Sequence, residues 1–343
     1  MRLILVMLLV GVVAPASAQA PAGGGTTYHV SRKIPIGGEG SWDYLTYDAV
    51  RHRLFLSHAT QVEVVDDASG KVIGRIPETP GVHGIALAQD LSRGFVSDGR
   101  DSTVTIFDLR SLEVTARVRV PGRNPDAILY DSASRRVLTF NGGSANATAL
   151  DAATGRVVGT LALGGKPEFA VADGHGGVFV NIEDRSEIVR LDAATLTVRA
   201  RWPLAGCEDP TGLALDRAHQ RLFSTCGNGR MAVVDAGTGH VIVLLPIGKG
   251  VDGSAFDPAT RLAFASNGEG TITVVQEESP DSFRVLGNVV TQRGARTMTL
   301  DSVSHRLYTV TAAFGPAPAP SAEQAHPRPS IQSGSFTVLV LEP

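Results

Sequence analysis

The 343-residue chain is poor in cysteine and in aromatic residues, and it has no excess of charge of one sign. Its 2 cysteines rule out a disulfide framework and a four-cysteine metal site. A net charge of −3 gives no field that would draw the whole molecule to nucleic acid or to an anionic membrane. Beyond the first residues, no segment reaches the ~18 continuous apolar residues of a membrane-spanning helix, so we expect no membrane span.

Several enzyme motifs are also missing. The chain has no C-x-x-C-H for haem attachment, no H-E-x-x-H, no G-x-S-x-G and no phosphate-binding P-loop. Its 9 histidines are not clustered at metal-ligand spacing. These absences exclude the enzyme classes that the motifs define and favour a protein that is not an enzyme.

The chain begins with a segment that resembles an export signal. Arg2 precedes an apolar run from Leu3 to Val13, and Ala16-Ser17-Ala18 matches an A-x-A cleavage site. We therefore expect residues 1–18 to be removed after Ala18 and the protein to be periplasmic or secreted. Residues 19–26 are predicted to be a flexible lead-in.

What the sequence has in abundance is glycine, with 38 residues, and short stretches in which apolar and polar residues alternate. The stretch from Thr103 to Leu138 holds four such strands separated by turn residues, as is typical of antiparallel sheets. A residue that closes a short apolar strand recurs about every 40 residues along the chain. These strand-closing markers are Asp48, Ala88, Asp131, Asp173, Asp216, Asp257 and Asp301.

Two further sets of residues follow the same period. A large apolar residue lies six or seven positions after each marker: Phe55, Phe95, Leu138, Phe179, Phe223, Phe264 and Tyr308. A second set of acids ends the third strand of each unit: Asp66, Asp108, Asp151, Asp192 and Asp235. An Asp followed by Ser, Thr or Gly closes a hairpin turn by bonding its own backbone, so we assign these aspartates a structural role.

Seven units of four strands predict an all-β, seven-bladed β-propeller of four-stranded antiparallel blades over residues 27–343, with a WD40-like repeat length. The last unit has strand patterns for only three strands. The strand-like segment 27–36 precedes the first unit, so we expect it to complete the last blade and close the ring. Residues 314–335 break the repeat with a Pro/Ala-rich insertion, which is either a disordered loop or a lid over one channel mouth.

The repeat also matches a known family. The matching residues are Asp101-Ser102-Thr103-Val104, Ile106-Phe107-Asp108, Thr154-Gly155, and Gly122 with Pro125. They resemble the repeat of the YVTN family of bacterial β-propellers, the YncE-like proteins, and the likeness covers nearly all of residues 27–343. The resemblance implies an exported seven-bladed propeller with, in some members, DNA or partner binding. The chain departs from the family pattern in blades six and seven, where Val275-Gln276 and Leu341-Glu342 replace the Asp turn.

The residue five positions before each marker should begin the innermost strand of its blade. These residues are Asp43, His83, Asp126, Glu168, Thr211, Asp252 and Arg296. In a propeller such positions surround one mouth of the central channel. The ring could hold a divalent cation through carboxylate and imidazole ligands, or a polar ligand with Arg296 as its anion partner. Alternatively, these side chains simply face the water of the channel.

A second polar set lies at the ends of the second strands. Its members are His58, Asp98, Asn141, Asn181, Asn228 and Asn267. Because the second strand runs antiparallel to the first, the two sets could form one broad polar face, although the Asn and Gly residues could instead only complete turns.

The predicted blades also place the two cysteines and the two tryptophans. Cys207 precedes the first strand of blade five and Cys226 ends the second, so we expect a disulfide in an exported protein, with two reduced thiols as the alternative. Trp42 and Trp202 lie near blade junctions, where packing is favoured over stacking on a ligand.

The sequence favours an exported binding or scaffold protein that uses the polar channel face for a small ligand or a periplasmic protein partner, as a monomer. The alternative is a metal-dependent lactonase- or lyase-like enzyme, in which Asp43, Asp126, Glu168 or Asp252 would bind the metal and His83 would act as acid or base. Single-stranded DNA binding is a second alternative that rests on the family resemblance.

Overall fold

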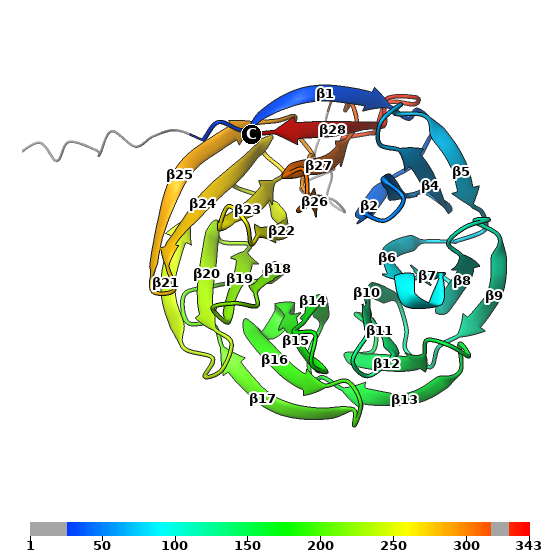
Figure 1. Cartoon of the computed structure of the whole chain (residues 1–343), viewed down its shortest axis with the longest axis horizontal. Helices are drawn as coiled ribbons and strands as arrows, with labels where there is room; N and C mark the ends of the chain where they lie inside the picture. Colours follow the sequence, from blue (N-terminus) through cyan, green and yellow to red (C-terminus); the bar gives the residue numbers. More distant parts are fainter. Residues whose placement is uncertain (1–25, 317–328) are drawn as a thin grey trace, which may run out of the picture.

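The computed structural model of the protein describes residues 26–316 and 329–343. Seven four-stranded antiparallel sheets surround a central axis, which confirms the predicted seven-bladed propeller (Figure 1). The signal peptide predicted for residues 1–18 lies outside the described residues, as does all of the lead-in except Thr26. No helix in the described ranges is long and apolar enough to cross a membrane.

Each blade runs outward from an innermost strand, here called A, to a rim strand called D. The A strands are β2 (Trp42–Asp48), β6 (Val82–Ala88), β10 (Pro125–Asp131), β14 (Pro167–Ala172), β18 (Pro210–Asp216), β22 (Val251–Asp257) and β26 (Met298–Asp301). The B strands are β3 (Arg53–His58), β7 (Arg93–Asp98), β11 (Arg136–Asn141), β15 (Gly177–Ile182), β19 (Arg221–Cys226), β23 (Leu262–Asn267) and β27 (Arg306–Thr311).

The outer half of each blade consists of strands C and D. The C strands are β4 (Gln61–Asp66), β8 (Thr103–Asp108), β12 (Asn146–Asp151), β16 (Glu187–Asp192), β20 (Arg230–Asp235), β24 (Thr271–Ser279) and β28 (Thr337–Glu342). The D strands are β5 (Val72–Ile76), β9 (Val114–Arg119), β13 (Val157–Ala162), β17 (Thr197–Pro203), β21 (Val241–Pro246), β25 (Ser282–Val290) and β1 (His29–Pro35). Two short 3₁₀ helices, η1 (Gln89–Leu91) and η2 (Glu183–Arg185), follow β6 and β15.

The hydrophobic core lies between neighbouring blades rather than within one blade. Residues of the B strands are buried on both faces of their sheets, whereas the D strand β13 alternates between half-buried and exposed residues. The periodic large residues fill the spaces between blades: Phe55 of blade one packs against Phe107 of blade two, with ring centroids 5.6 Å apart. One blade therefore cannot bury its own apolar surface, and stability requires the complete ring.

The N-terminal strand closes this ring, as predicted. β1 pairs antiparallel with β28, and Ile34 lies opposite Val338 in the register of the pair. Ile34 is buried in the core of blade seven, and the hydroxyl of Tyr28 donates a hydrogen bond of 2.8 Å to the carbonyl of His305. The last blade is thus built from both ends of the chain (Figure 1).

The periodic aspartates have the structural role that the sequence indicated. Asp48 is fully buried and accepts hydrogen bonds from the amides of Val50 and Arg51. Asp235 accepts hydrogen bonds from the turn amides after β20 in the same way. Blade six has no Asp at the turn after its third strand, where Val275-Gln276 stand, and its outer strands β24 and β25 form a longer hairpin, each with 9 residues. The departure from the family pattern therefore changes the length of a hairpin and leaves the fold intact.

The two described ends of the insertion pair with each other. Phe314 and Ile331 form an isolated β-bridge, and the amide of Gly315 donates to the carbonyl of Ser330 at 2.8 Å. This pairing is absent from the sequence-based prediction because the Pro/Ala-rich composition hides it. The prediction of a disordered loop or a lid concerns mainly residues 317–328, which lie outside the described residues.

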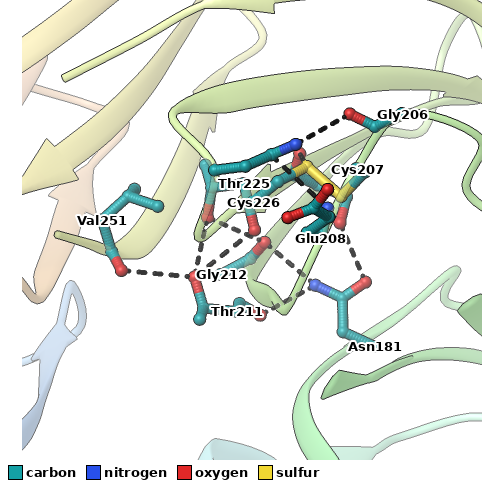
Figure 2. Close-up of a disulfide and its surroundings, with 11 residues drawn as sticks. Asn181, Gly206, Cys207, Glu208, Thr211, Gly212, Thr225, Cys226 and Val251 are labelled. Carbon is teal, nitrogen blue, oxygen red and sulfur yellow. Dashed lines mark hydrogen bonds between the residues drawn. A yellow bond between two sulfur atoms is a disulfide. The ribbon is translucent and has the colours of Figure 1, made fainter. Parts of the chain in front are cut away.

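Cys207 and Cys226 are joined by a disulfide in blade five, near the start of its innermost strand (Figure 2). Cys207 lies in the loop before β18, and Cys226 is the last residue of β19, opposite Pro210. Both side chains are buried in the core between blades four and five. The bond fixes the loop that leads into the innermost strand of blade five.

Deleting residues 27–36 tests ring closure. The deletion removes β1 and exposes the edge of β28, so we expect the protein to aggregate or to lose cooperative melting. Solubility and melting by circular dichroism measure this. The control is Lys33→Ala, which changes an exposed residue of the same strand. A soluble deletion variant with unchanged melting would contradict closure by β1.

Replacing both cysteines with serine tests the disulfide. The bond closes a loop across a sequence separation of 19 residues, so its loss should lower the free energy of unfolding by roughly 3 kcal/mol. Denaturant melts measure the difference, and Glu208→Ala, which changes an exposed side chain next to Cys207, is the control. Two reactive thiols in the unreduced native protein would show that the bond does not form.

Candidate functional site at the channel mouth

The seven predicted channel residues lie at one end of the central axis. Six lie at the second position of strands β2, β6, β10, β14, β18 and β22, and Arg296 lies two residues before β26. All A strands run in the same direction along the axis, so equivalent positions surround one mouth. The structure divides these seven residues into separate groups with different partners.

The residues from blades one, two and three form the tightest group. Nδ1 of His83 lies 2.5 Å from Oδ2 of Asp43 and 3.6 Å from Oδ1 of Asp126. One ligating atom from each side chain lies within 4.8 Å of the other two. All three side chains are partly buried, with exposed fractions of 13–26%. Two carboxylates therefore share a single imidazole.

The pKa values of His83 and Asp126 are both shifted in this group. Burial lowers the pKa of His83, but the hydrogen bond to Asp43 and the charge of Asp126 outweigh it and raise the pKa to about 9. Burial raises the pKa of Asp126 to about 8, although the charge of His83 opposes this shift. A pKa of about 8 means that Asp126 mostly keeps its proton at neutral pH, and an additional positive charge beside it would favour its ionised form.

Blade four supplies an acid that has its own cation. Glu168 lies 3.0 Å from Nζ of Lys166, which also pairs with Glu183 of η2. Burial raises the pKa of Glu168 despite the opposing charge of Lys166. Lys166 and Glu183 were not among the predicted site residues. Lys166 could have been found, because it lies two residues before Glu168 in the sequence. Glu183 could not, because the place of η2 beside the mouth is visible only in the fold.

Blades five, six and seven complete the mouth. The hydroxyl of Thr211 lies 3.2 Å from that of Thr225 and 3.5 Å from the carbonyl of Val251, so it joins two blades (Figure 2). Nε of Arg296 lies 3.7 Å from Oδ2 of Asp252. Burial raises the pKa of Asp252 to about 7, although the charge of Arg296 opposes the shift. Arg296 is 42% exposed and is free to bind an anionic group in addition.

Two aromatic side chains lie across the axis below the ring. Tyr44 of blade one stacks on Phe169 of blade four, with ring centroids 5.6 Å apart, and its hydroxyl donates to the carbonyl of Glu168 at 3.2 Å. Both rings line the small polar cavity at the mouth and also an apolar cavity of about 280 Å³ further along the axis. The stack therefore separates the polar mouth from an apolar channel.

The sequence contained a signal for this stack that the prediction missed. The residue after each ring position is small or of moderate size in the other five blades: Gly84, Ala127, Gly212, Gly253 and Thr297. Only Tyr44 and Phe169 are large at this position. Two aromatic rings from different blades can meet across a narrow axis where the other blades leave space.

A groove of about 480 Å³ lies beside the mouth. It is lined by Ser41, Trp42, Gly250, Gly268, Arg293, Gly294, Arg296, Phe314, Pro329 and Ile331. Arg296 thus faces both the groove and the ring, and the described ends of the insertion form one wall of the groove.

Trp42 stacks on Phe336 at 5.4 Å and Trp202 on Phe179 at 5.9 Å, which agrees with the packing role expected for both.

The second polar set does not form one face with the ring, and that expectation is wrong. Five members are almost fully buried: His58, Asp98, Asn141, Asn181 and Asn267. Asp98, for example, accepts hydrogen bonds from the hydroxyls of Thr103 and Thr105 inside its own blade. The exposed sixth member, Asn228, donates to the carbonyl of Gly206. Asn141 and Asn267 likewise donate to the hydroxyls of Thr148 and Thr273 on the neighbouring strand, so these amides bond between strands rather than completing turns as the alternative interpretation had it.

The fold and the mouth together define a β-propeller with an acid-rich, partly enclosed channel mouth. No family model matches the chain, and no curated protein matches its sequence. Among solved structures, it is similar to U3-55K, with a TM-score of 0.73 and 12% identity over 91% of this chain and 98% of that chain. It is also similar to Kuenenia stuttgartiensis hydrazine synthase, with a TM-score of 0.69 and 13% identity over 87% and 95%. At such identities the likeness shows the fold alone.

The shared imidazole leads to a test by NMR titration. The pKa of His83 should be about 9 in the wild-type protein, and Asp43→Asn should lower it towards the ordinary histidine range. Asp252→Asn is the control, because Asp252 contacts Arg296 instead. With the pKa above its unfolded value of 6.5, His83 stabilises the fold fully below pH 6.5, and this contribution is lost as the pH rises through 9. Equal effects of both variants would contradict the assignment.

Proposed function

We propose that this protein is an exported binding propeller of the YVTN type, which binds a small polar ligand at the channel mouth. Export is supported by the N-terminal motif with Arg2, the run from Leu3 to Val13 and the cleavage site at Ala18. The family assignment is supported by the repeat residues, such as Ile106-Phe107-Asp108. A binding role is consistent with the propeller fold.

One observation carries the proposal: the carboxylates at the mouth are poorly compensated. Asp43 and Asp126 share His83, while burial raises the pKa of Asp126 to about 8 and that of Asp252 to about 7. A fold gains nothing from holding half-buried acids in this state, because their ionised forms lose hydration without a matched partner. A cationic group from a ligand would supply that partner.

The arrangement also suggests the class of ligand. The Asp43–His83–Asp126 group offers a place for a cationic centre, and Arg296 offers a donor for an anionic group on the other side of the mouth. The Tyr44–Phe169 stack limits how deep a ligand can enter. We therefore favour a small ligand with a positive group, or the corresponding side chain of a periplasmic partner, over a long chain threaded through the axis.

A ligand screen by thermal shift, followed by calorimetry, tests this proposal. A screen of small cationic, zwitterionic and anionic compounds should give hits among those with a positive group. Asp43→Ala with Asp252→Ala should weaken their binding at least about tenfold, since each lost charge contact is worth around 1.4 kcal/mol or more. Asp101→Asn, an exposed acid outside the mouth, is the control. Hits whose affinity is unchanged in the double variant would contradict a site at the mouth.

A metal-dependent lactonase- or lyase-like enzyme is the second candidate. It is favoured by the three ligating atoms of Asp43, His83 and Asp126, which lie within 4.8 Å of one another. Carboxylate and imidazole ligands from three blades suit a divalent ion, which would polarise a substrate carbonyl. His83 would then be a ligand rather than the acid or base first expected. Glu168 and Asp252 have separate partners, Lys166 and Arg296.

Metal binding discriminates the two candidates. Calorimetry with a divalent ion at millimolar concentration should show binding that Asp43→Ala with Asp252→Ala weakens if the mouth is a metal centre. Binding of organic cations without any metal favours the first candidate.

Single-stranded DNA is the third candidate from the family resemblance, and its phosphates would be repelled by the carboxylates of the mouth.

A further inference from the structure

A second cluster of chemically active side chains lies at the opposite end of the blades from the channel ring. Asp216 is the last residue of β18, whose second residue is Thr211 of the ring. His219 lies in the turn that follows, and Glu277 comes from β24 of the next blade. The cluster therefore bridges blades five and six and is independent of the mouth.

The three side chains converge on one point. Nδ1 of His219 lies 2.7 Å from Oδ2 of Asp216 and 3.1 Å from Oε1 of Glu277. One ligating atom from each lies within 4.8 Å of the other two. Asp216 and Glu277 are buried, whereas the His219 side chain is 35% exposed, so the cluster opens to solvent on one side.

The surroundings of the Glu277 carboxylate point to a ligand. Its side chain has no exposed surface, and neither carboxylate oxygen has a hydrogen-bond partner of acceptable geometry. In the described part of the chain, no lysine or arginine forms an ion pair with Glu277 or Asp216. A buried carboxylate whose only charged neighbour is a partly exposed histidine destabilises the fold, so its presence calls for a further partner.

The other blades show that the fold does not need an acid at this position. The Glu277 amide donates to the carbonyl of Arg261, and the residues that make the equivalent bond in blades two to five are apolar: Leu109, Ala152, Ala193 and Ala236. All four of those residues are buried. The position is an ordinary apolar packing site in most blades, and blade six alone combines an uncompensated acid with a neighbouring histidine.

Blade one provides the instructive contrast. The equivalent residue there is Asp67, whose amide donates to the carbonyl of His52. Asp67 accepts a hydrogen bond of 2.8 Å from the hydroxyl of Tyr308 and pairs with Arg32 and Arg306, each at 3.7 Å. An acid at this position can therefore be compensated by protein side chains. For Glu277 the described residues supply only His219.

We propose that Asp216, His219 and Glu277 bind a divalent transition-metal ion, of the Zn²⁺ type, between blades five and six. Two carboxylate oxygens and one imidazole nitrogen match the ligand preference of zinc, and the solvent-facing side leaves a fourth position for water. The ion would neutralise the buried acids and link the turn after β18 to strand β24.

The competing occupant of the cluster is a proton. Burial and the charge of Asp216 raise the pKa of Glu277 to about 7, while His219 opposes the shift. A protonated Glu277 would need no metal. Zn²⁺ affinity distinguishes the two occupants. Only a metal site loses affinity for Zn²⁺ when one of these three side chains is removed.

The experiment compares Zn²⁺ binding in matched variants of the metal-stripped full-length protein. A background with Asp43→Asn and Asp126→Asn removes the ligands at the channel mouth. In this background, Glu277→Ala installs the residue that blades three to five already have, so the variant should fold. Calorimetry with ZnCl₂ should show one ion per chain before the Glu277 change and at least a tenfold loss of affinity after it. His219→Asn should give the same loss.

Melting temperatures provide the second readout. Without metal, Glu277→Ala should melt at or above the temperature of its background, because it removes an uncompensated buried acid. Added ZnCl₂ should raise the melting temperature only of proteins that keep both Glu277 and His219. The proposal is overturned if Glu277→Ala binds Zn²⁺ as tightly as its background, or if the background binds none. Because Asp43 and Asp126 are altered throughout, the result does not depend on the function of the mouth.

Discussion

The antiparallel pairing of β1 with β28 is the contact on which the rest of the structure depends. Six blades are continuous segments of chain, whereas the seventh requires two ends that are more than three hundred residues apart. Because the core lies between blades, an open ring would expose apolar faces on both sides of the gap. The channel mouth depends on the same closure: His83 contacts acids from two other blades, and these distances hold only in a closed ring.

Closure also sets what can occupy the axis. Seven innermost strands converge there, and the space left is too narrow for seven large side chains. Five blades therefore have small or moderate residues just below the ring, and only Tyr44 and Phe169 extend across. The outcome is a shallow polar mouth above an aromatic stack. Half-buried carboxylates arranged around such a mouth lose hydration, which makes their protonation sensitive to any added charge.

The fold could be predicted from the sequence because its signals are periodic. Asp48 and Asp235 mark turns by a local mechanism, the bonding of a side chain to its own turn backbone, so their role does not depend on distant residues. The residues at the channel mouth could be found by counting along the repeat. The direction of a side chain could not be counted in this way. Asp98 lies at the predicted end of its strand, but its side chain points into the blade and accepts hydrogen bonds from the hydroxyls of Thr103 and Thr105.

The partners within the mouth were beyond prediction for a similar reason. That His83 lies between Asp43 and Asp126 depends on the angle between blades and on rotamers, which leave no trace in a single sequence. Lys166 lies outside the strand pattern, and Glu183 comes from a short helix that replaces an ordinary turn. Periodicity locates a backbone position, but electrostatic pairing is decided by distances of a few ångströms between blades.

Both proposed sites lie at departures from the repeat, and charge compensation separates them from the departures that have a structural role. Asp67 replaces an apolar residue, but Tyr308 and two arginines satisfy it, so its role is complete within the fold. The carboxylate of Glu277 at the equivalent position has no hydrogen-bond partner among the described residues, and burial raises the pKa of Asp126 at the mouth despite the charge of His83. Buried acids are costly when they are unpaired, and a folded chain retains them at no gain unless something outside the chain completes them. The same physical criterion therefore underlies both proposed sites, which lie at opposite ends of the blades.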